Sequence, residues 1–117
     1  LDFERSDNGT MLAAGEYVGE QWLSDFGLTV SADGAGSTGF TPGGQARVFD
    51  TANPTGSDED LGTPNSAFGG PGIGDFGSPT NSVALGKVLI IQESDKDAPD
   101  DNQFGGVISF MFVDPVK

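Results

Sequence analysis

The most apolar run of the chain is Leu85-Gly86-Lys87-Val88-Leu89-Ile90-Ile91-Gln92, and its β-branched residues predict a central strand. Three further segments have the same character, and we predict strands at residues 26–32, 45–49 and 107–113, the last of them buried. Long irregular stretches separate these strands, and little helix is expected. The sequence therefore predicts an all-β fold, an antiparallel β-sandwich or jelly-roll-like domain with long acidic and glycine-rich loops.

The length of the chain limits it to one domain. Its 117 residues suffice for a single hydrophobic core, so we expect residues 1–117 to form one β-sandwich. Low hydrophobicity together with 19 glycines and 7 prolines is also typical of disorder. The four strand segments contain enough apolar and β-branched residues to build a core, so we reject disorder as a description of the whole chain.

Charge excludes several classes of partner. The chain has 18 acidic and 5 basic residues, a formal net charge of −13, and neither histidine nor cysteine. This charge repels phosphate backbones and anionic lipids, and no segment is long and apolar enough to span a bilayer, so we expect no nucleic acid and no membrane insertion. Without thiols or imidazoles, the remaining metal chemistry is that of hard cations with oxygen ligands.

The beginning of the sequence bears on localisation. The first residue is Leu1 rather than Met, and no signal peptide is recognisable. A chain processed in this way fits export. We therefore expect a secreted, extracellular protein at the cell surface.

Several shorter segments have expected local structures. Asp2-Phe3-Glu4 alternates like the start of a strand, and residues 7–10 form a turn that also matches a glycosylation sequon at Asn8. Residues 13–23 fit a short helix or a turn. Residues 33–44 are expected to be loop, and residues 50–81 form an unusually long loop that is either disordered or organised by a ligand.

Two acidic segments carry the metal hypothesis. Residues 50–62 and 93–102 are rich in Asp and Glu, and each follows a predicted strand, so adjacent strands would bring both loops to one end of the sandwich. Calcium takes six to eight oxygen ligands from such loops, although the spacing is not that of an EF-hand. The alternative is that both loops are solvated surface. The candidate ligands for one or two calcium ions are Asp50, Asp58, Asp60, Glu93, Asp101 and Asn102.

The residues give little support for an enzymatic function. A glycoside hydrolase needs two carboxyl groups in different environments, whereas these Asp residues are clustered and exposed. The chain lacks a Ser-His-Asp or Cys-His set, and the glycine run at residues 69–74 lacks the Lys and the helix of a phosphate loop. We therefore expect no enzymatic activity.

Three aromatic residues have two possible roles. Trp22, Tyr17 and Phe40 are suited to stacking on a sugar face, as in carbohydrate-binding modules. The alternative for Trp22 and Tyr17 is a place in the core, which is common for a lone Trp in a small domain.

Four segments occur in a recognisable order. They are Asp50-Thr51-Ala52-Asn53-Pro54-Thr55-Gly56-Ser57-Asp58-Glu59-Asp60-Leu61-Gly62-Thr63-Pro64-Asn65, Leu89-Ile90-Ile91-Gln92-Glu93, Pro99-Asp100-Asp101-Asn102 and Gly105-Gly106-Val107-Ile108-Ser109-Phe110. In this order they resemble acidic β-sandwich modules of secreted bacterial proteins, many of which carry C-terminal sorting signals. The resemblance covers most of the chain and implies export, a β-rich fold and calcium. It implies no substrate, because no activity is established for these modules.

The resemblance also bears on assembly. Such modules continue past the Phe-x-Phe strand into further strands, whereas this sequence ends at Lys117. A sheet edge left open in this way accepts a strand from another copy, and residues 1–4 are the natural donor. Repeated donation without closure would produce a homopolymeric fibre.

Three functions follow from the sequence. The first is a non-enzymatic, calcium-binding structural or adhesive module of the cell surface or matrix that self-assembles into fibres by strand donation. The alternative is a calcium-dependent carbohydrate-binding module, which would bind glycans. A small hydrolase is a distant third, because it would need a pair of carboxyl groups with different pKa values in a cleft.

Overall fold

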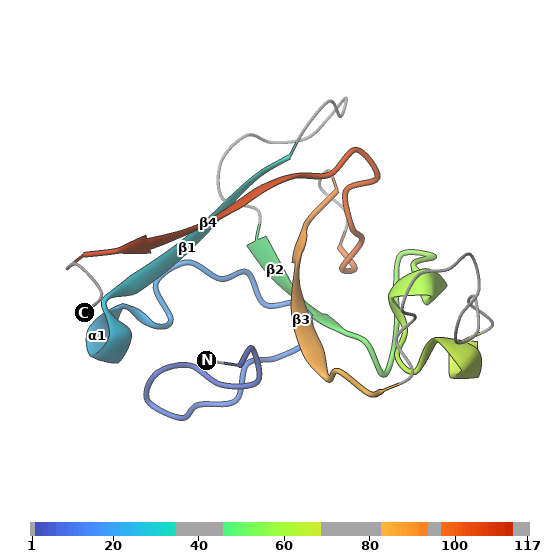
Figure 1. Cartoon of the computed structure of the whole chain (residues 1–117), viewed down its shortest axis with the longest axis horizontal. Coiled ribbons are helices and arrows are strands. Elements are labelled where there is room, and N and C mark those ends of the chain that lie inside the picture. Colours follow the sequence, from blue (N-terminus) through green and yellow to red (C-terminus); the bar gives the residue numbers. More distant parts are fainter. Residues whose placement is uncertain (1, 35–45, 69–82, 94–96, 114–117) are drawn as a thin grey trace.

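The computed structural model describes residues 2–34, 46–68, 83–93 and 97–113 (Figure 1). These residues are mostly strands, turns and irregular segments with little helix. The strands are β1 (Leu28–Gly34), β2 (Ala46–Asp50), β3 (Lys87–Ile91) and β4 (Gly106–Phe112). The helical elements are α1 (Leu23–Phe26) and two short 3-10 turns, η1 (Glu59–Leu61) and η2 (Asn65–Phe68).

The strands form two small antiparallel sheets, one of β1 with β4 and one of β2 with β3. In the first sheet Leu28 lies opposite Phe112, and Ala32 lies opposite Ile108. Burial alternates along β1 as expected for a strand with one covered face, and Val30 is among the buried residues. In the second sheet Asp50 pairs with Lys87.

The core lies on the covered face of β1 and includes residues of β2. Trp22 is fully buried, packs edge-to-face against Phe3 with ring centroids 5.9 Å apart, and donates its indole N–H to the carbonyl of Arg5. The remaining buried members of this cluster are Leu12, Val18, Leu28, Val30, Ala32, Ala46 and Val48. Residues from the N-terminal segment and from both sheets therefore share one core.

The N-terminal segment widens the second sheet. The N–H of Val18 donates to the carbonyl of Ala46, and the N–H of Val48 donates to the carbonyl of Glu16. This segment lies along the edge of β2 that does not face β3, and Tyr17 forms a bridge with Arg47. Residues 46–49 of β2 are all buried, so both faces of this strand are covered as well as its two edges.

All four predicted strands are present, with ends shifted by one or two residues. The first begins at Leu28, because Phe26 ends helix α1, and it continues through Gly34, two residues beyond its predicted end at residue 32. The turn at residues 7–10 is confirmed, with Gly9 at a φ of 83°. Most of the predicted loop at residues 33–44 lies outside the described residues.

The prediction of a short helix or a turn at residues 13–23 is confirmed as a turn, which lies at residues 14–15, and the only helix there begins at Leu23. Three other local predictions are wrong. Residues 2–4 belong to no strand, although Arg5 forms an isolated bridge with Met11. β4 was predicted to be buried but is largely exposed. Within the described ranges β3 pairs along its length with β2 alone, so it is not a central strand there.

Candidate metal centre

Three carboxylates from two loops come together at one point of the molecule. Asp58 belongs to the loop after β2, and Asp100 and Asp101 belong to the segment that follows β3. Ligand oxygens of the three lie within 4.8 Å of one another. Ligands on opposite sides of a calcium ion at about 2.4 Å are about 4.8 Å apart, so this spacing suits a shared ion. We call these three residues the carboxylate cluster.

The two loops meet for a different reason than the sequence suggested. Because β2 and β3 are antiparallel, their following loops leave from opposite ends of the sheet. The chain after β2 turns back, however, and the hydroxyl of Thr55 donates to the carbonyl of Pro99 at 2.6 Å. The backbone N–H of Asp101 donates to Oδ2 of Asp58 at 2.8 Å. These two bonds join the loops directly.

Gly56 allows the close approach of the two loops. A Cβ on Gly56 would lie 2.8 Å from Cβ and Cγ of Asp100 and 2.8 Å from the carbonyl oxygen of Pro99. The φ of Gly56 is also positive, at 68°. Only glycine satisfies both conditions without displacing Asp100, so this position is part of how the cluster is built.

Gln92 holds the second loop from within. Its side chain is fully buried, its Nε2 donates to the carbonyls of Glu93 and Ala98, and its Oε1 accepts the N–H of Asp100. The backbone of Glu93 also bonds to that of Asp100 at 2.7 Å. A buried amide that uses both ends in this way specifies the path of the loop and therefore the position of Asp100.

The surroundings of Asp58 in the cluster raise the pKa of its carboxyl group. Burial is the main cause that raises the pKa of Asp58 from 3.8 to about 7, and the neighbouring carboxylates of Asp101 and Asp100 add to the rise. The hydrogen bond from the N–H of Asp101 acts in the opposite direction. A cation among these oxygens would favour the charged form of Asp58, and a proton takes part of that role at neutral pH.

The structure brings together two of the six predicted ligands, Asp58 and Asp101. Asp50 uses its carboxylate locally, accepting the N–H of Ala52 and the side-chain amide of Asn53. Asp60 is exposed in η1 and lies outside the cluster. The carboxylate of Asp50 therefore closes its own turn.

The last two predicted ligands also have local partners. Glu93 accepts the side-chain amide of Gln103 at 3.3 Å. Asn102 is buried, its Oδ1 accepts the N–H of Phe104, and its Nδ2 has no hydrogen-bond partner among the described residues. Asn102 also lines an apolar hollow of about 260 Å³ together with Leu89 and Ile108.

Asp100 is the member of the cluster that sequence reasoning missed. The predicted ligands include Asp101 but not its neighbour Asp100. Asp100 reaches the cluster because it directly follows Pro99, which lies at the contact with Thr55 and Gly56. That contact is long-range and is not visible in the sequence.

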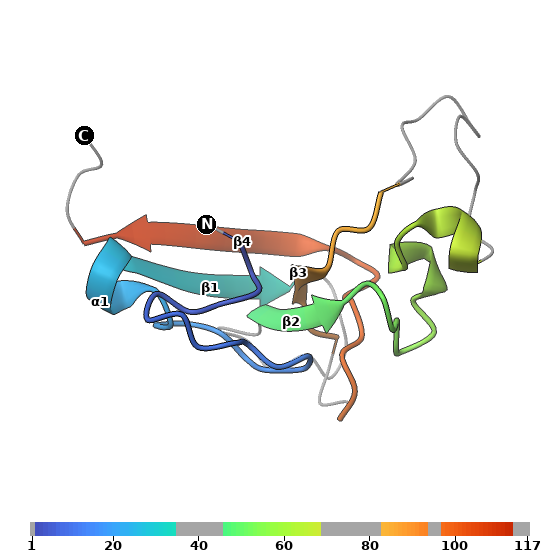
Figure 2. The same ribbon diagram turned by 90° about the horizontal axis from the view of Figure 1, so that it is seen from below.

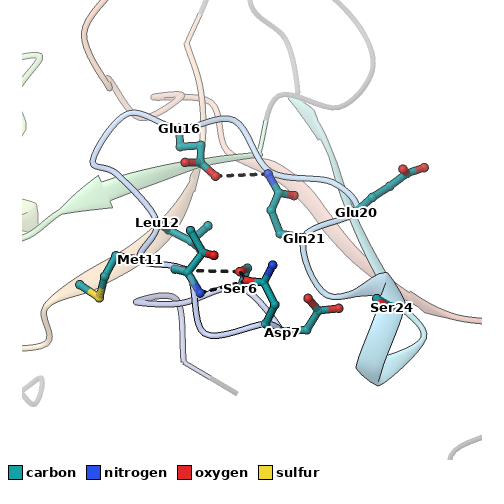
Figure 3. A pocket seen from close by; sticks show the side chains of 10 residues that line it. Ser6, Asp7, Met11, Leu12, Glu16, Glu20, Gln21 and Ser24 are labelled. Carbon is teal, nitrogen blue, oxygen red and sulfur yellow. Dashed lines mark hydrogen bonds between the residues drawn. The ribbon is translucent and has the colours of Figure 1, made fainter.

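A second acidic hollow lies on another part of the molecule (Figure 3). It measures about 350 Å³ and has Asp7, Glu16 and Glu20 on its wall. Figure 3 shows Glu16 directed toward Gln21, whose Nε2 donates to it at 3.4 Å. Asp7 accepts the N–H of Asp25. These acids do not form a three-ligand group within the described ranges, so the hollow is not a second metal candidate.

The aromatic predictions have separate outcomes. Trp22 lies in the core, which confirms the second of the two alternatives for this residue. Tyr17 is 44 % exposed, and the Arg47 guanidinium lies over its ring at 4.6 Å from the centroid. A core position for Tyr17 is therefore wrong. Phe40 and the glycine run at residues 69–74 lie outside the described residues.

No protein-family model, curated protein or solved structure matches this chain. Within the described ranges, no helix is both long and apolar enough to cross a membrane. The fold and the cluster thus describe a β-rich protein with an oxygen-rich candidate site for a hard cation.

Proposed function

We propose that this protein is a non-enzymatic, extracellular structural or adhesive module that binds calcium through Asp58, Asp100 and Asp101. The observation that carries the proposal is the meeting of three carboxylates from two loops within 4.8 Å. Three carboxylates supply up to six of the six to eight oxygens that calcium takes, and carbonyls or water complete such shells. An ion held there would cross-link the loops that follow β2 and β3.

The architecture belongs to the same proposal. We take the two antiparallel sheets as layers of a β-sandwich or jelly-roll-like domain. In support of this, Val30 of β1 and Val48 of β2 lie in one core cluster. Calcium would then stabilise one end of the sandwich, and self-association through an open strand edge would let the module act at a cell surface or in a matrix.

The burial of the carboxylates explains why an ion would matter for stability. Asp100 is only 4 % exposed, and Asp58 and Asp101 are half-buried. Two unit charges at a distance of 4.8 Å repel by about 3 to 4 kcal/mol at an effective dielectric constant near 20. An ion that binds only the folded state removes this repulsion and adds its own binding free energy.

The decisive experiment is a thermal melt of the wild-type chain in calcium and in chelator. At a calcium concentration a hundred times its dissociation constant, the native state gains about 2.7 kcal/mol, so we expect the Tm to rise on the order of 10 °C. Asp58→Asn and Asp101→Asn should abolish most of this rise. Magnesium should give a smaller rise, because it requires a rigid octahedral shell.

Asp60→Asn is the matched control, since Asp60 lies two residues from Asp58, is exposed and stands outside the cluster. It should keep the full calcium response. Calorimetric titration of the same variants with calcium separates loss of binding from loss of folding. A wild-type Tm that does not respond to calcium, or an Asp58→Asn variant with an unchanged response, would overturn the proposal.

A calcium-dependent carbohydrate-binding module is the second candidate, favoured by the exposure of Tyr17. One face of its ring contacts Arg47, which also donates from Nη2 to the carbonyl of Asp97, in the segment that leads to the cluster. The ring is thus connected to the candidate metal site. Glycan binding that is abolished both by chelation and by Tyr17→Ala would favour this function over a purely structural one.

A further inference from the structure

Strand β4 carries large apolar side chains that are exposed on both of its faces. In the described ranges β4 pairs with β1 alone, and Figure 2 shows it as the outer strand of that pair. Exposure of these side chains runs from 46 to 65 %. They are Val107, Phe110, Met111, Phe112 and the next residue, Val113. No strand among the described residues lies along the outer edge of β4.

The two faces of β4 are assigned by its register with β1. Phe110 lies opposite Val30, and Phe112 lies opposite Leu28, so both rings are on the face that carries the core. Val107 and Met111 are on the other face. A layer packed on one face would cover only half of this surface, whereas a strand beside β4 would cover side chains on both.

The backbone of β4 identifies the groups that are free on its outer edge. The N–H of Val113 donates to the carbonyl of Gly27 at 2.8 Å, so the pair of these residues is hydrogen-bonded. In an antiparallel ladder such pairs alternate, which directs the N–H and C=O groups of Ile108, Phe110 and Phe112 away from β1. These three residues present donors and acceptors to an incoming strand.

The charge of this edge favours a second copy of the same chain as the occupant. The chain has a net charge of −13, yet residues 105–113 contain no charged side chain. Natural edge strands are normally protected by Lys, Pro or a bulge, and β4 has none of these. Two copies that meet at β4 therefore bring no like charges into the strand pairing.

We propose that β4 pairs antiparallel with β4 of a second copy, about a two-fold axis at Phe110. In this register Phe110 lies opposite Phe110 of the partner subunit, and Ile108 lies opposite Phe112 of the partner subunit. All three outward-facing residues of each strand then find a backbone partner. On the other face, Val107 lies opposite Val113 of the partner subunit. The two sheets β1–β4 join into one four-stranded sheet.

The exposed area is sufficient for such a contact. At roughly 150 to 250 Å² for a large side chain, the five residues at about half exposure leave on the order of 500 Å² of apolar surface. A standard interface buries about 800 Å² per partner, of which slightly more than half is apolar. The β4 edge therefore has the apolar area of a specific interface.

This inference rests on the self-association included in the proposed function, and it changes the expected form of the assembly. A two-fold contact uses the same surface twice and closes, so it produces a dimer instead of a fibre. The N-terminal segment is poorly placed as a donor, because Phe3 packs on Trp22 and Glu4 forms an ion pair with Lys87 at 3.2 Å. The carboxylate cluster takes no part in the contact.

The register provides a charge-swap test by sedimentation velocity over a wide range of protein concentration. The wild-type chain should form a dimer. V107E/V113E places Glu opposite Glu at both ends of the interface, so its dissociation constant should rise by roughly tenfold or more. V107K/V113E places Lys opposite Glu at the same two points and should restore the dimer. Both native side chains are more than 60 % exposed, so neither pair of changes disturbs the core.

V83E/L85E is the matched control, because it adds the same charge at two exposed positions outside β4. It should remain dimeric. A wild-type monomer at all concentrations, a V107E/V113E variant that associates like the wild type, or open-ended polymers would each overturn two-fold pairing. Calcium titration of the same samples keeps the two proposals separate, since a monomeric V107E/V113E that still binds calcium confirms the interface without involving the metal site.

Discussion

Asp58 affects both the stability of the fold and the proposed binding of an ion. Its Oδ2 accepts the N–H of Asp101, which orients the carboxylate, while burial and the neighbouring acids raise its pKa. The charged Asp58 carboxylate therefore destabilises the folded state when no ion is bound, and it stabilises that state when an ion is bound.

We predict opposite pH responses with and without calcium. In chelator, a folded pKa of about 7 against 3.8 means that the folded chain binds the extra proton between these values. The stabilisation that this proton gives to the folded state is therefore complete below about pH 4, and it is lost as the pH rises through 7. In calcium the ion displaces the proton, so the calcium-induced rise in Tm should increase through pH 7.

The measurement is a series of melts from pH 5 to 8.5 in both conditions, with Asp58→Asn as the reference. The variant has no titrating group at this position, so the difference between its Tm and that of the wild type isolates Asp58. A difference in chelator that is constant across this range would contradict the raised pKa.

At the scale of elements, β3 and the segment that follows it form the frame of the candidate site. After Gln92 the chain turns, and Asp101 returns to form a bridge with Gln92. The N–H of Asn102 donates to the carbonyl of Ile91. The frame therefore consists of backbone pairing fixed by one buried amide, and it does not depend on the ion.

We predict that Gln92→Leu destabilises the protein and weakens calcium binding together. The change is close in volume but leaves the carbonyls of Glu93 and Ala98 and the N–H of Asp100 without their side-chain partner. Unpaired buried groups cost about 1 to 3 kcal/mol each, so a loss of about 2 to 4 kcal/mol is expected after partial access of water. Urea unfolding in chelator measures this loss, and calorimetry measures calcium binding.

Gln103→Leu serves as the control for this prediction. Gln103 is exposed and makes its side-chain bond to Glu93, outside the buried frame. It should alter stability by less than about 0.5 kcal/mol, as surface changes usually do. Equal losses in the two variants would show that Gln92 has no special part in positioning Asp100.

At the scale of the whole molecule, net charge opposes compactness. The chain carries −13 within principal extents of 42 × 32 × 26 Å. At 0.01 M ionic strength the screening length is about 30 Å, comparable to these extents, whereas at 0.15 M it is about 8 Å. Repulsion between distant carboxylates is therefore strong at low salt and weak at physiological salt.

We predict that sodium chloride raises the Tm in chelator without reproducing the calcium effect. The rise should be gradual between 0.01 and 0.15 M, because it comes from screening over the entire surface. Calcium at matched ionic strength should add a further, saturating rise that Asp58→Asn removes. Melts in both salts at equal ionic strength are sufficient, and identical curves for the two salts would mean that calcium acts only as a screening ion.

The sequence by itself determined the elements and the available chemistry. Apolar, β-branched runs located all four strands, since the preference for an extended backbone is a local property of those side chains. The absence of histidine and cysteine left oxygen ligands, and the acidic segments contained all three members of the cluster. Two of the three, Asp58 and Asp101, were among the predicted ligands.

Only the tertiary structure decided which residues meet and which faces are covered. Asp58 meets Asp100 because the loop after β2 turns back and Gly56 permits contact, and neither event follows from local preference. β4 is as apolar as a core strand, yet it is exposed because no described segment pairs with its outer edge. Burial and site geometry depend on contacts between residues far apart in the chain, and a local pattern of side chains does not specify these.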